Sequence, residues 1–479
     1  MVGCFSLLTS SRGRRTQQES ENNGSNSQQQ MVEVGRALAG EESSLPVPLL
    51  PAYSPPGVAP PFEAAELAGV LKDLHQSIES RIFGLSGELR QLSLKMFEYK
   101  ELAFEERKTH DLFCNWFEDH FAKKKDGWKV TRHAFGMETA FSVEFEHRPK
   151  GYEGPLKTIG YNSELDALPG VGHACGHPLI AICGVASAIA TADALIKHDL
   201  PGKVVLLGTP AEEAGGGKVI LLKNGAYKGM DVCLMAHPGP FSTVGSSLAV
   251  ESFRVTFTGK AAHAAAAPWE GVNALDAAVQ AYVNIATLRQ QVPPSHRMHA
   301  IIQGDNFAVN VIPDEALVIC NARAPTKPEL EALLPRVKKC FEAAALATGC
   351  KMHVKTTMRY LDLENSTPLT DTFHQVMASK YDDVFDRIDM IGSTDFGDVT
   401  YALPSLHPLY SIPLTDPKGG ANHTHQFEKD ARTEAAHKKT LQVAVALALT
   451  GVKVAVDEDY AEEVRRMFED WKKGRRSAP

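Results

Sequence analysis

The order of the apolar segments is the feature that most restricts how this chain can fold. Between residues 157 and 237, short β-rich runs such as KTIGYNSE, GKVVLLGT and DVCLMAHP alternate with helical patterns. This alternation predicts crossover units and a mostly parallel sheet that is covered on both faces. Between 248 and 360 the order becomes strand, helix, strand, strand, helix, strand, which is typical of a ferredoxin-like sandwich. We therefore expect an α/β fold in which a larger domain, residues 61–247 and 361–479, is interrupted by a smaller α/β domain, residues 248–360.

The first 60 residues differ in composition from the rest. TQQESENNGSNSQQQ at 16–30 is polar and of low complexity, and LPVPLLPAYSPPGVAPP at 45–61 is rich in proline. Neither segment carries enough apolar surface to offset the entropy that is lost on ordering. The sequence therefore predicts a disordered tail over residues 1–60, with helical apolar spacing that begins near Phe62.

Charge, hydropathy and cysteine usage argue against several classes of protein. With 50 Lys+Arg against 58 Asp+Glu, the formal charge is −8, which offers no basic field for a nucleic acid. No apolar run approaches the ~20 residues of a membrane-spanning helix, so we expect no membrane association. The eight cysteines lack CxxC spacing and lie mostly in apolar stretches, which favours reduced thiols. The apolar run at the N-terminus is too short for a secretory signal. We therefore expect the protein to be located in the cytoplasm.

Residue types that bind metals recur at the ends of the expected strands. In open α/β sheets, sites form at the carboxyl ends of the strands. The residues of this kind are Glu164, Asp166, Cys175, His177, Glu212, Glu213, His237 and, far downstream in KGGANHTHQF, His423.

Two of these motifs indicate metal chemistry by their composition. Thiolate and imidazole suit Zn²⁺, and Gly176 lets a loop aim Cys175 and His177 inward together. In the pair Glu212–Glu213, one carboxylate can bind a cation while the other acts as a general base. The alternatives are a buried thiol beside a packed histidine and a solvated acidic loop. Four further histidines could each be core residues when taken singly: His237, His407, His423 and His425.

Several longer motifs, in a fixed order, resemble one enzyme family. They are SELDALPGVGHACGHP, LGTPAEEAGGGK, LMAHP, GKAAHAAAAPWEGVNALDA, NVIPDEA and GSTDFGD. Over about Phe62 to Val456, the chain resembles the amidohydrolase branch of the aminoacylase/carboxypeptidase metallopeptidase superfamily. The resemblance implies a catalytic α/β domain interrupted by a smaller lid and dimerisation domain, in agreement with the order of the apolar segments.

The resemblance also implies a role for each motif residue. Glu212 is implied as the general base and Asp166 as an acid that orients a ligand. Glu164 stands where the wider superfamily has a histidine ligand, so we expect it to support the site without being a ligand. Zn²⁺ is the first expectation for the metal, with Mn²⁺ and Co²⁺ as alternatives. The implied ligands of two divalent ions are Cys175, a candidate bridge, with His177, Glu213, His237 and His423.

The smaller domain supplies the remaining expected site residues. His263 in GKAAHAAAAP stands where relatives place an imidazole that reaches across a dimer to stabilise an oxyanion. Asn310 in NVIPDEA and Arg323 in NARAP stand where relatives bind the substrate carboxylate. An ordinary loop histidine and a structural ion pair are the alternatives for His263 and Arg323. The alternating strand SFRVTFTG and the helix NALDAAVQAYVNIATL are expected to give this domain a sheet edge and an apolar helix face, both suited to pairing with a second copy. Relatives dimerise through this domain, so the resemblance implies a homodimer that forms through the lid domain.

These assignments predict a metal-dependent amidohydrolase or dipeptidase that cleaves the amide bond of a dipeptide or an N-acyl amino acid. A binding or regulatory protein that keeps the fold is one alternative, although it would be expected to lose a ligand or the base. A cysteine hydrolase using Cys175 and His177 is another, but it leaves the glutamate pair without a role. Pro178 departs from the Asp or Asn of many relatives, and the H-T-x-x-F spacing favours His423 over His425 as the last ligand.

The composition of the first 60 residues leads to a first prediction. A truncated protein that begins near Phe62 should keep the activity and the thermal midpoint of the full chain, because a polar, proline-rich tail contributes no core contact. Activity assays and thermal unfolding of the two proteins test this. A truncated protein that loses either property would contradict the prediction.

Overall fold

The computed structural model describes residues 64–124, 127–305, 307–390, 392–418 and 420–476. The expected tail over 1–60 lies outside the described residues. The helical spacing expected near the start of the folded chain is confirmed, and a further helix follows that the sequence analysis did not anticipate. These helices are α2 (Ala64–Gly84), α3 (Ser86–Tyr99) and the unanticipated α4 (Arg107–His120).

A six-stranded sheet forms the larger part of the fold, in the order β1-β2-β4-β3-β5-β11. The pairings β4–β3, β3–β5 and β5–β11 are parallel, whereas β1–β2 and β2–β4 are antiparallel. The expected mostly parallel sheet is thus confirmed, with an antiparallel edge that was not expected. The strands are β1 (Lys129–Arg132), β2 (Phe141–His147), β3 (Thr158–Glu164), β4 (Gly202–Thr209), β5 (Val232–Leu234) and β11 (Ser405–Leu406).

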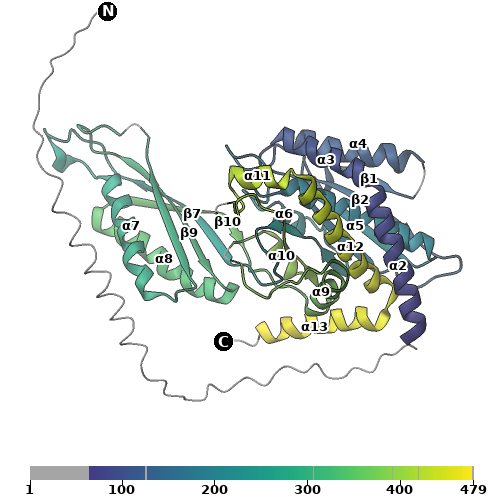
Figure 1. Ribbon diagram of the computed structural model, residues 1–479. Helices are drawn as coiled ribbons and strands as arrows, with labels where there is room; N and C mark the ends of the chain where they lie inside the picture. Colours follow the sequence, from purple (N-terminus) through teal and green to yellow (C-terminus); the bar gives the residue numbers. More distant parts are fainter. Residues whose placement is uncertain (1–63, 125–126, 306, 391, 419, 477–479) are drawn as a thin grey trace, which may run out of the picture. The chain divides into compact units, whose positions relative to one another are not determined.

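Helices cover both faces of this sheet, as alternate residues of β4 show. Val204 and Leu206 belong to the hydrophobic cluster that includes α5 and α12, while Val205 and Leu207 belong to a second cluster with α6 and α10. In Figure 1, α12 lies beside α5 and α2, and all three pairs are in contact. The helices are α5 (His177–Lys197), α6 (Gly217–Lys223), α10 (Phe396–Thr400) and α12 (Glu434–Val456).

One close approach fixes α5 against β3. A Cβ on Gly184 would lie 2.5 Å from the backbone oxygen of Asn162, so only glycine allows the helix to pack this close to the strand. As a result, the N-terminal end of α5 meets the carboxyl end of β3. The sequence places Cys175 and His177 at that helix end and Glu164 at that strand end.

The inserted unit, which we define as Ala249–Tyr360, forms a separate four-stranded sheet in the order β10-β7-β9-β8. Its two helices pack against the sheet (Figure 1), and a hydrophobic cluster of its own lies between them. All six elements expected between 248 and 360 are present, although the exact domain limits stay a prediction. They are β7 (Ala249–Thr258), α7 (Ala274–Leu288), β8 (Arg297–Gln303), β9 (Glu315–Ala324), α8 (Lys327–Thr348) and β10 (Lys351–Tyr360).

One expectation about this unit is wrong. The sequence analysis placed an exposed sheet edge at the strand SFRVTFTG, but this strand, β7, pairs with β10 on one side and β9 on the other. Strand alternation reports which face is buried and carries no information on which strands are neighbours. The edges of the sheet are β8 and β10.

The end of the chain returns to the larger sheet and covers it. A short parallel pair, β6 (His237–Gly239) with β12 (Leu409–Ser411), extends from the edge where β5 and β11 end. The other elements of this segment are α9 (Thr367–Tyr381), α11 (His425–Ala431) and α13 (Glu458–Arg476).

The expectation that no apolar run reaches the length of a membrane span was too strong. By length and composition alone, helices α5 and α12 are both long and apolar enough to cross a membrane, because their alanine, glycine and threonine residues interrupt the apolar run only weakly. The most apolar window of each is largely buried inside the protein, 89% for α5 and 72% for α12, as in the core helices of a folded domain. The seven cysteines in the described residues are free thiols, as expected.

Candidate metal centre

The expected ligands converge because four parallel strands end at the same edge of the sheet. Asp166 follows β3, Glu212 and Glu213 follow β4, and His237 follows β5. Parallel strands bring their carboxyl ends together, so residues far apart in sequence meet here.

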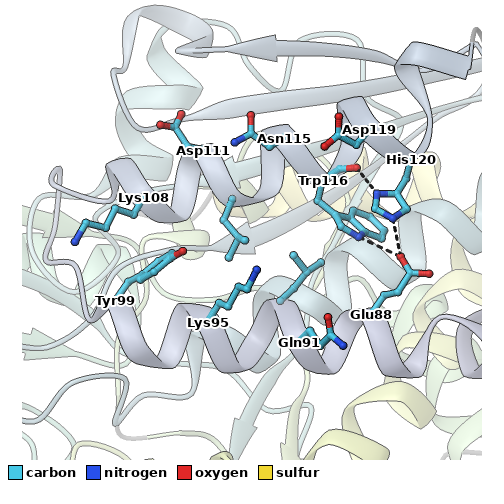
Figure 2. A pocket seen from close by; sticks show the side chains of 12 residues that line it. Glu88, Gln91, Lys95, Tyr99, Lys108, Asp111, Asn115, Trp116, Asp119 and His120 are labelled. Atoms are coloured by element: carbon cyan, nitrogen blue, oxygen red, sulfur yellow. Dashed lines mark hydrogen bonds and ion pairs between the residues drawn. The ribbon is translucent and has the colours of Figure 1, made fainter.

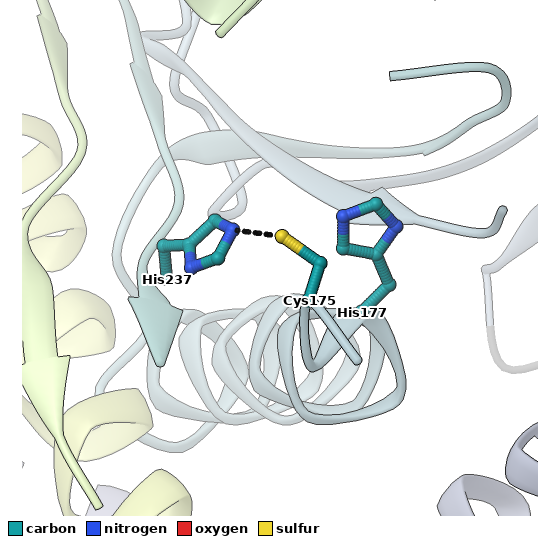
Figure 3. A group of neighbouring side chains, drawn as sticks. All are labelled: Cys175, His177 and His237. Atoms are coloured by element: carbon teal, nitrogen blue, oxygen red, sulfur yellow. Dashed lines mark hydrogen bonds between the residues drawn. The ribbon is translucent and has the colours of Figure 1, made fainter. Parts of the chain in front are cut away.

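Cys175 stands at the centre of the cluster. Its sulfur lies 3.3 Å from Nε2 of His237. Figure 3 shows the thiol between two imidazoles, with Cys175 and His177 at the N-terminal end of α5 and His237 on β6. The turn needs Gly176, whose φ is +85° and whose Cβ, if present, would lie 2.6 Å from Cγ of Pro238.

Backbone carbonyls fix which nitrogen of each histidine faces the cluster. Nδ1 of His177 donates to the backbone oxygen of Asp166 at 2.7 Å, and Nδ1 of His237 donates to that of Pro238 at 2.8 Å. Since a carbonyl only accepts, each Nδ1 carries a proton and each Nε2 is available as a ligand atom. Burial lowers the pKa of His237 to about 4, which keeps its ring neutral, whereas, despite burial, the carboxylates of Glu164 and Asp166 raise the pKa of His177 well above its usual value.

A second group of ligand atoms shares Cys175 with the first. The ligand atoms of Cys175, Glu213 and His423 lie within 4.8 Å of one another, as do those of Cys175, His177 and His237. His423 is held there by its own N–H, which donates to the backbone oxygen of Ala174 at 2.8 Å. The structure therefore brings the five expected ligands together around one sulfur, and in the described residues these groups include His423 and not His425.

The side-chain carboxylate of Asp166 binds the backbone of both glutamates. Its two oxygens accept the N–H of Glu212 at 3.1 Å and the N–H of Glu213 at 3.0 Å. The same carboxylate approaches Nδ1 of His177 at 3.3 Å. One buried side chain thus orients the loop after β4 and the first residue of α5 together, as expected for an acid that positions ligands.

Two further side chains, which the sequence analysis missed, hold the same loop. Oε1 of the buried Glu106 accepts the N–H of Ala211 at 2.9 Å, and Ala211 has a φ of +59° that is unusual for a residue other than glycine. The hydroxyl of Tyr360, at the end of β10, donates to the backbone oxygen of Glu212 at 2.9 Å. Both contacts join segments that are far apart in sequence.

The electrostatics of the cluster favour a cation. Burial, together with the charges of Glu164 and Glu213, raises the pKa of Glu212 well above its usual value, and burial also raises the pKa of Glu213. Oε2 of Glu164, Nε2 of His177 and Oε1 of Glu213 are all buried without a hydrogen-bond partner. Buried polar atoms rarely remain unpaired, so this set of donors fits divalent metal ions.

Lys218 and Asp395 are the other site residues that the sequence analysis missed. The Lys218 ammonium is fully buried and lies 2.5 Å from Oε1 of Glu164 and 2.6 Å from Oδ1 of Asp395. A lysine within the apolar helix GKVILLK was the available signal, because a buried ammonium requires carboxylate partners. Asp395 lies in GSTDFGD, a motif on which the family resemblance rests but in which the sequence analysis assigned Asp395 no role. His407 is also buried at this edge, 5.9 Å from the His237 ring by their centroids.

The structure places the three residues expected from the smaller domain elsewhere in the same chain. His263 and Asn310 are both exposed and lie on neighbouring segments. The N–H of Ala264 donates to the backbone oxygen of Asn310 at 2.9 Å, and the backbone of His263 forms an isolated antiparallel β-bridge with Val311. Nδ1 of His263 accepts from the N–H groups of Ala265 and Ala266, which leaves Nε2 free of these contacts. No described contact joins His263 to the metal-ligand cluster of its own chain.

Arg323 lies on β9 and is partly buried. Its Nη1 donates to the hydroxyl of Ser393 at 2.8 Å, and burial lowers its pKa. Within the described part of the chain it makes no ion pair with a carboxylate, which argues against the alternative of a structural ion pair.

A groove of about 560 Å³ lies apart from these residues, between α3 and α4 (Figure 2). It is lined by side chains of both charges, among them Glu88, Lys95, Lys108 and Asp111. Trp116 and His120 close one end through contacts with Glu88. None of the expected site residues lines this groove, so it is not the candidate site.

Comparisons with known proteins agree with this fold. Residues 250–349 match the family model of the peptidase dimerisation domain. The chain is 39% identical to the Xaa-Arg dipeptidase of Mus musculus over 417 residues, which cover 84% of this chain and 93% of that protein. It is 38% identical to the Xaa-Arg dipeptidase of Homo sapiens over 395 residues, covering 79% and 88%.

Solved structures show the same fold. A dinuclear metal-binding peptidase of the M20 family from Bacillus subtilis superposes with a TM-score of 0.57 at 20% identity, covering 78% of this chain and 99% of that one. An aminobenzoyl-glutamate utilization protein from Klebsiella pneumoniae superposes with a TM-score of 0.58 at 18% identity, covering 79% of this chain and 97% of that one.

The fold and the site define a hydrolase of the peptidase and amidohydrolase class, in which a smaller unit interrupts an α/β domain. The chain belongs to the M20 peptidase family, and the resemblance inferred from its motifs is confirmed. The motifs resemble those of the Xaa-Arg (β-alanyl-lysine) dipeptidases, in agreement with the identity to the two mammalian proteins.

The double contact of Asp166 leads to a prediction about stability. Asp166→Asn leaves one acceptor oxygen for two N–H groups, so the free energy of unfolding should fall by about 1–3 kcal/mol. Urea unfolding measures the change. The control is Asp231→Asn, because Asp231 is exposed and accepts a single N–H, from Thr158 at 2.7 Å. An equal loss in both variants would contradict the special role of Asp166.

Proposed function

We propose that this protein is a metal-dependent dipeptidase or amidohydrolase that cleaves a dipeptide or an N-acyl amino acid. The observation that carries the proposal is the convergence of two ligand groups on Cys175, with Glu212 beside them. The family membership and the names of the mammalian relatives support a dipeptide substrate.

The proposed ligands are Cys175, His177, Glu213, His237 and His423, which hold two divalent metal ions, Zn²⁺ before Mn²⁺ or Co²⁺. When bound, such ions supply Lewis acidity toward an amide carbonyl and acidify water. Glu212 takes a proton from the attacking water at its carboxylate and passes it to the leaving amine. A raised pKa suits this exchange, because the carboxyl group must both accept and release a proton within one turnover.

Arg323 and Asn310 are proposed to bind the carboxylate of the substrate. The Arg323 guanidinium has lost part of its solvation and donates to the Ser393 hydroxyl, and no carboxylate in the described residues pairs with it. A planar, partly desolvated guanidinium can donate two parallel N–H hydrogen bonds to the two oxygens of one carboxylate. Asn310 lies beside His263, so one part of the inserted unit would meet both the carboxylate and the scissile bond.

A homodimer is proposed because exposed apolar residues gather on the inserted unit. Helix α7 exposes Val279, Tyr282 and Val283, and the edge strand β8 exposes Ile301. The loops that carry His263 and Asn310 expose Trp269 and Val309. Exposed apolar groups of this kind mark interaction surfaces, and the matching family model is one of dimerisation. His263, which does not contact its own cluster, would then act on the partner subunit.

A cysteine hydrolase is disfavoured by the surroundings of Cys175. Burial and the Glu213 carboxylate raise the pKa of the thiol well above its usual value. A nucleophilic thiolate needs positive surroundings, whereas a cation among these carboxylates would bind the sulfur. We also propose a cytoplasmic location, which the free cysteines in the described residues support.

The first test separates the base from the ligands. Glu212→Gln should keep the fold and metal content and reduce turnover by about 10²–10⁴-fold, because the carboxamide cannot accept the proton. Glu213→Ala and His237→Ala should lower metal content as well as the rate. Metal analysis after dialysis and steady-state kinetics measure both. An active Glu212→Gln protein, or normal metal content in both ligand variants, would contradict the proposal.

The second test concerns the action of His263 across the dimer. His263→Ala and Glu212→Gln should each be inactive, and mixing them under conditions of subunit exchange should restore part of the activity. One site of each mixed dimer combines an intact Glu212 with an intact His263 from the other subunit. Exchange is verified with two differently tagged chains. Exchange without recovered activity would show that His263 does not serve the partner.

A further inference from the structure

The buried lysine of α6 pairs directly with two carboxylates at this edge of the sheet. Lys218 is fully buried, with its ammonium between Glu164 and Asp395. Oδ2 of Asp395 also accepts the backbone N–H of Lys218 at 2.8 Å. Asp395 therefore holds the lysine by both its backbone and its side chain, and the ammonium has little freedom to move.

Glu164 uses only one of its two oxygens for this contact. Oε1 binds the Lys218 ammonium at 2.5 Å, while Oε2 is buried without a hydrogen-bond partner. Oε2 lies 3.2 Å from Nε2 of His177, within ion-pair distance when the ring is protonated, and neither atom has a hydrogen-bond partner. The ligand atoms of Glu164, His177 and Glu212 lie within 4.8 Å of one another. Lys218 thus binds one oxygen of the carboxylate, and the other oxygen faces Nε2 of His177.

We propose that Lys218 is a positioning residue: by binding Oε1 of Glu164, it keeps Oε2 directed at the metal beside His177, so that Glu164 helps to hold that ion. The inference rests on the proposed function, since it needs a metal at His177. It revises the expectation that Glu164 only supports the site. Asp395 acts one step further away by fixing the lysine.

The variants must keep the buried charge balanced. Lys218→Met alone leaves two buried carboxylates without a cation and is expected to fold poorly. The double variant Lys218→Met/Asp395→Asn removes one charge of each sign and so keeps the net charge of the three positions. Glu164→Gln keeps the Lys218–Asp395 pair. Asp395→Asn alone keeps the contact between Lys218 and Glu164.

The readout is metal affinity, measured by competition with a chelator on proteins whose circular dichroism shows that they are folded. We expect Glu164→Gln and the double variant each to lose about 10–100-fold in affinity for Zn²⁺. Adding Glu164→Gln to the double variant should cause no further loss, because Lys218 acts through Glu164. Asp395→Asn alone should remain within a few-fold of the wild type.

A lysine elsewhere on the sheet provides the control. Lys203→Met breaks the contact between Lys203 and Glu144, 2.7 Å long, at the opposite end of β4 and should leave metal affinity unchanged. Wild-type affinity in Glu164→Gln or in the folded double variant would overturn the inference, as would an equal loss in Asp395→Asn. If the double variant does not fold, Glu164→Gln alone decides. Glu213→Ala serves as the reference: if it too retains metal, the proposed metal centre itself is wrong.

Discussion

Buried negative charge at one sheet edge is the constraint on which the rest of this structure depends. The carboxylates of Glu164, Asp166, Glu212 and Asp395 are buried, and the ammonium of Lys218 contacts those of Glu164 and Asp395. Such a cluster is costly unless cations or hydrogen bonds compensate it. Backbone N–H groups satisfy Asp166, and the lysine satisfies one oxygen each of Glu164 and Asp395. The atoms that remain unpaired are those that face the proposed metal ions.

Backbone contacts, more than side-chain packing, hold the groups in this arrangement. The loop after β4 is fixed at three successive residues, by Glu106 at Ala211 and by Asp166 and Tyr360 at the two glutamates. The contact from Tyr360 comes from the last residue of the inserted unit, so the position of Glu212 is tied to the point where that unit rejoins the larger sheet. A general base must keep its distance to the reacting atoms within fractions of an ångström, and several independent clamps provide this accuracy.

The sequence predicted those features that depend on local pattern. The elements of the inserted unit, the parallel strands and the convergence of Cys175, His177 and the glutamate pair follow from apolar periodicity and motif position. Features that depend on pairing between distant segments could not be predicted from the sequence. The central place of β7 depends on which strands are its neighbours, and the contact of Lys218 with Asp395 joins residues 177 positions apart. Strand β1 was not predicted because it has only four residues, whereas β2, FSVEFEH, alternates regularly and could have been predicted from its sequence.

In the proposed function, chemistry and substrate recognition are divided between the two parts of the chain, and this division explains why the substrate is harder to deduce than the reaction. The proposed ligands and the base lie within contact distance of one another in a single chain. His263 and Asn310 are exposed on a different unit, and only Arg323 is linked to the larger part, through Ser393. The proposed reaction therefore depends on a buried group of side chains that admits little variation. In the proposed homodimer, the exposed surface of the inserted unit of a second subunit would complete the substrate pocket, so the shape of that pocket would depend on how the two subunits pair.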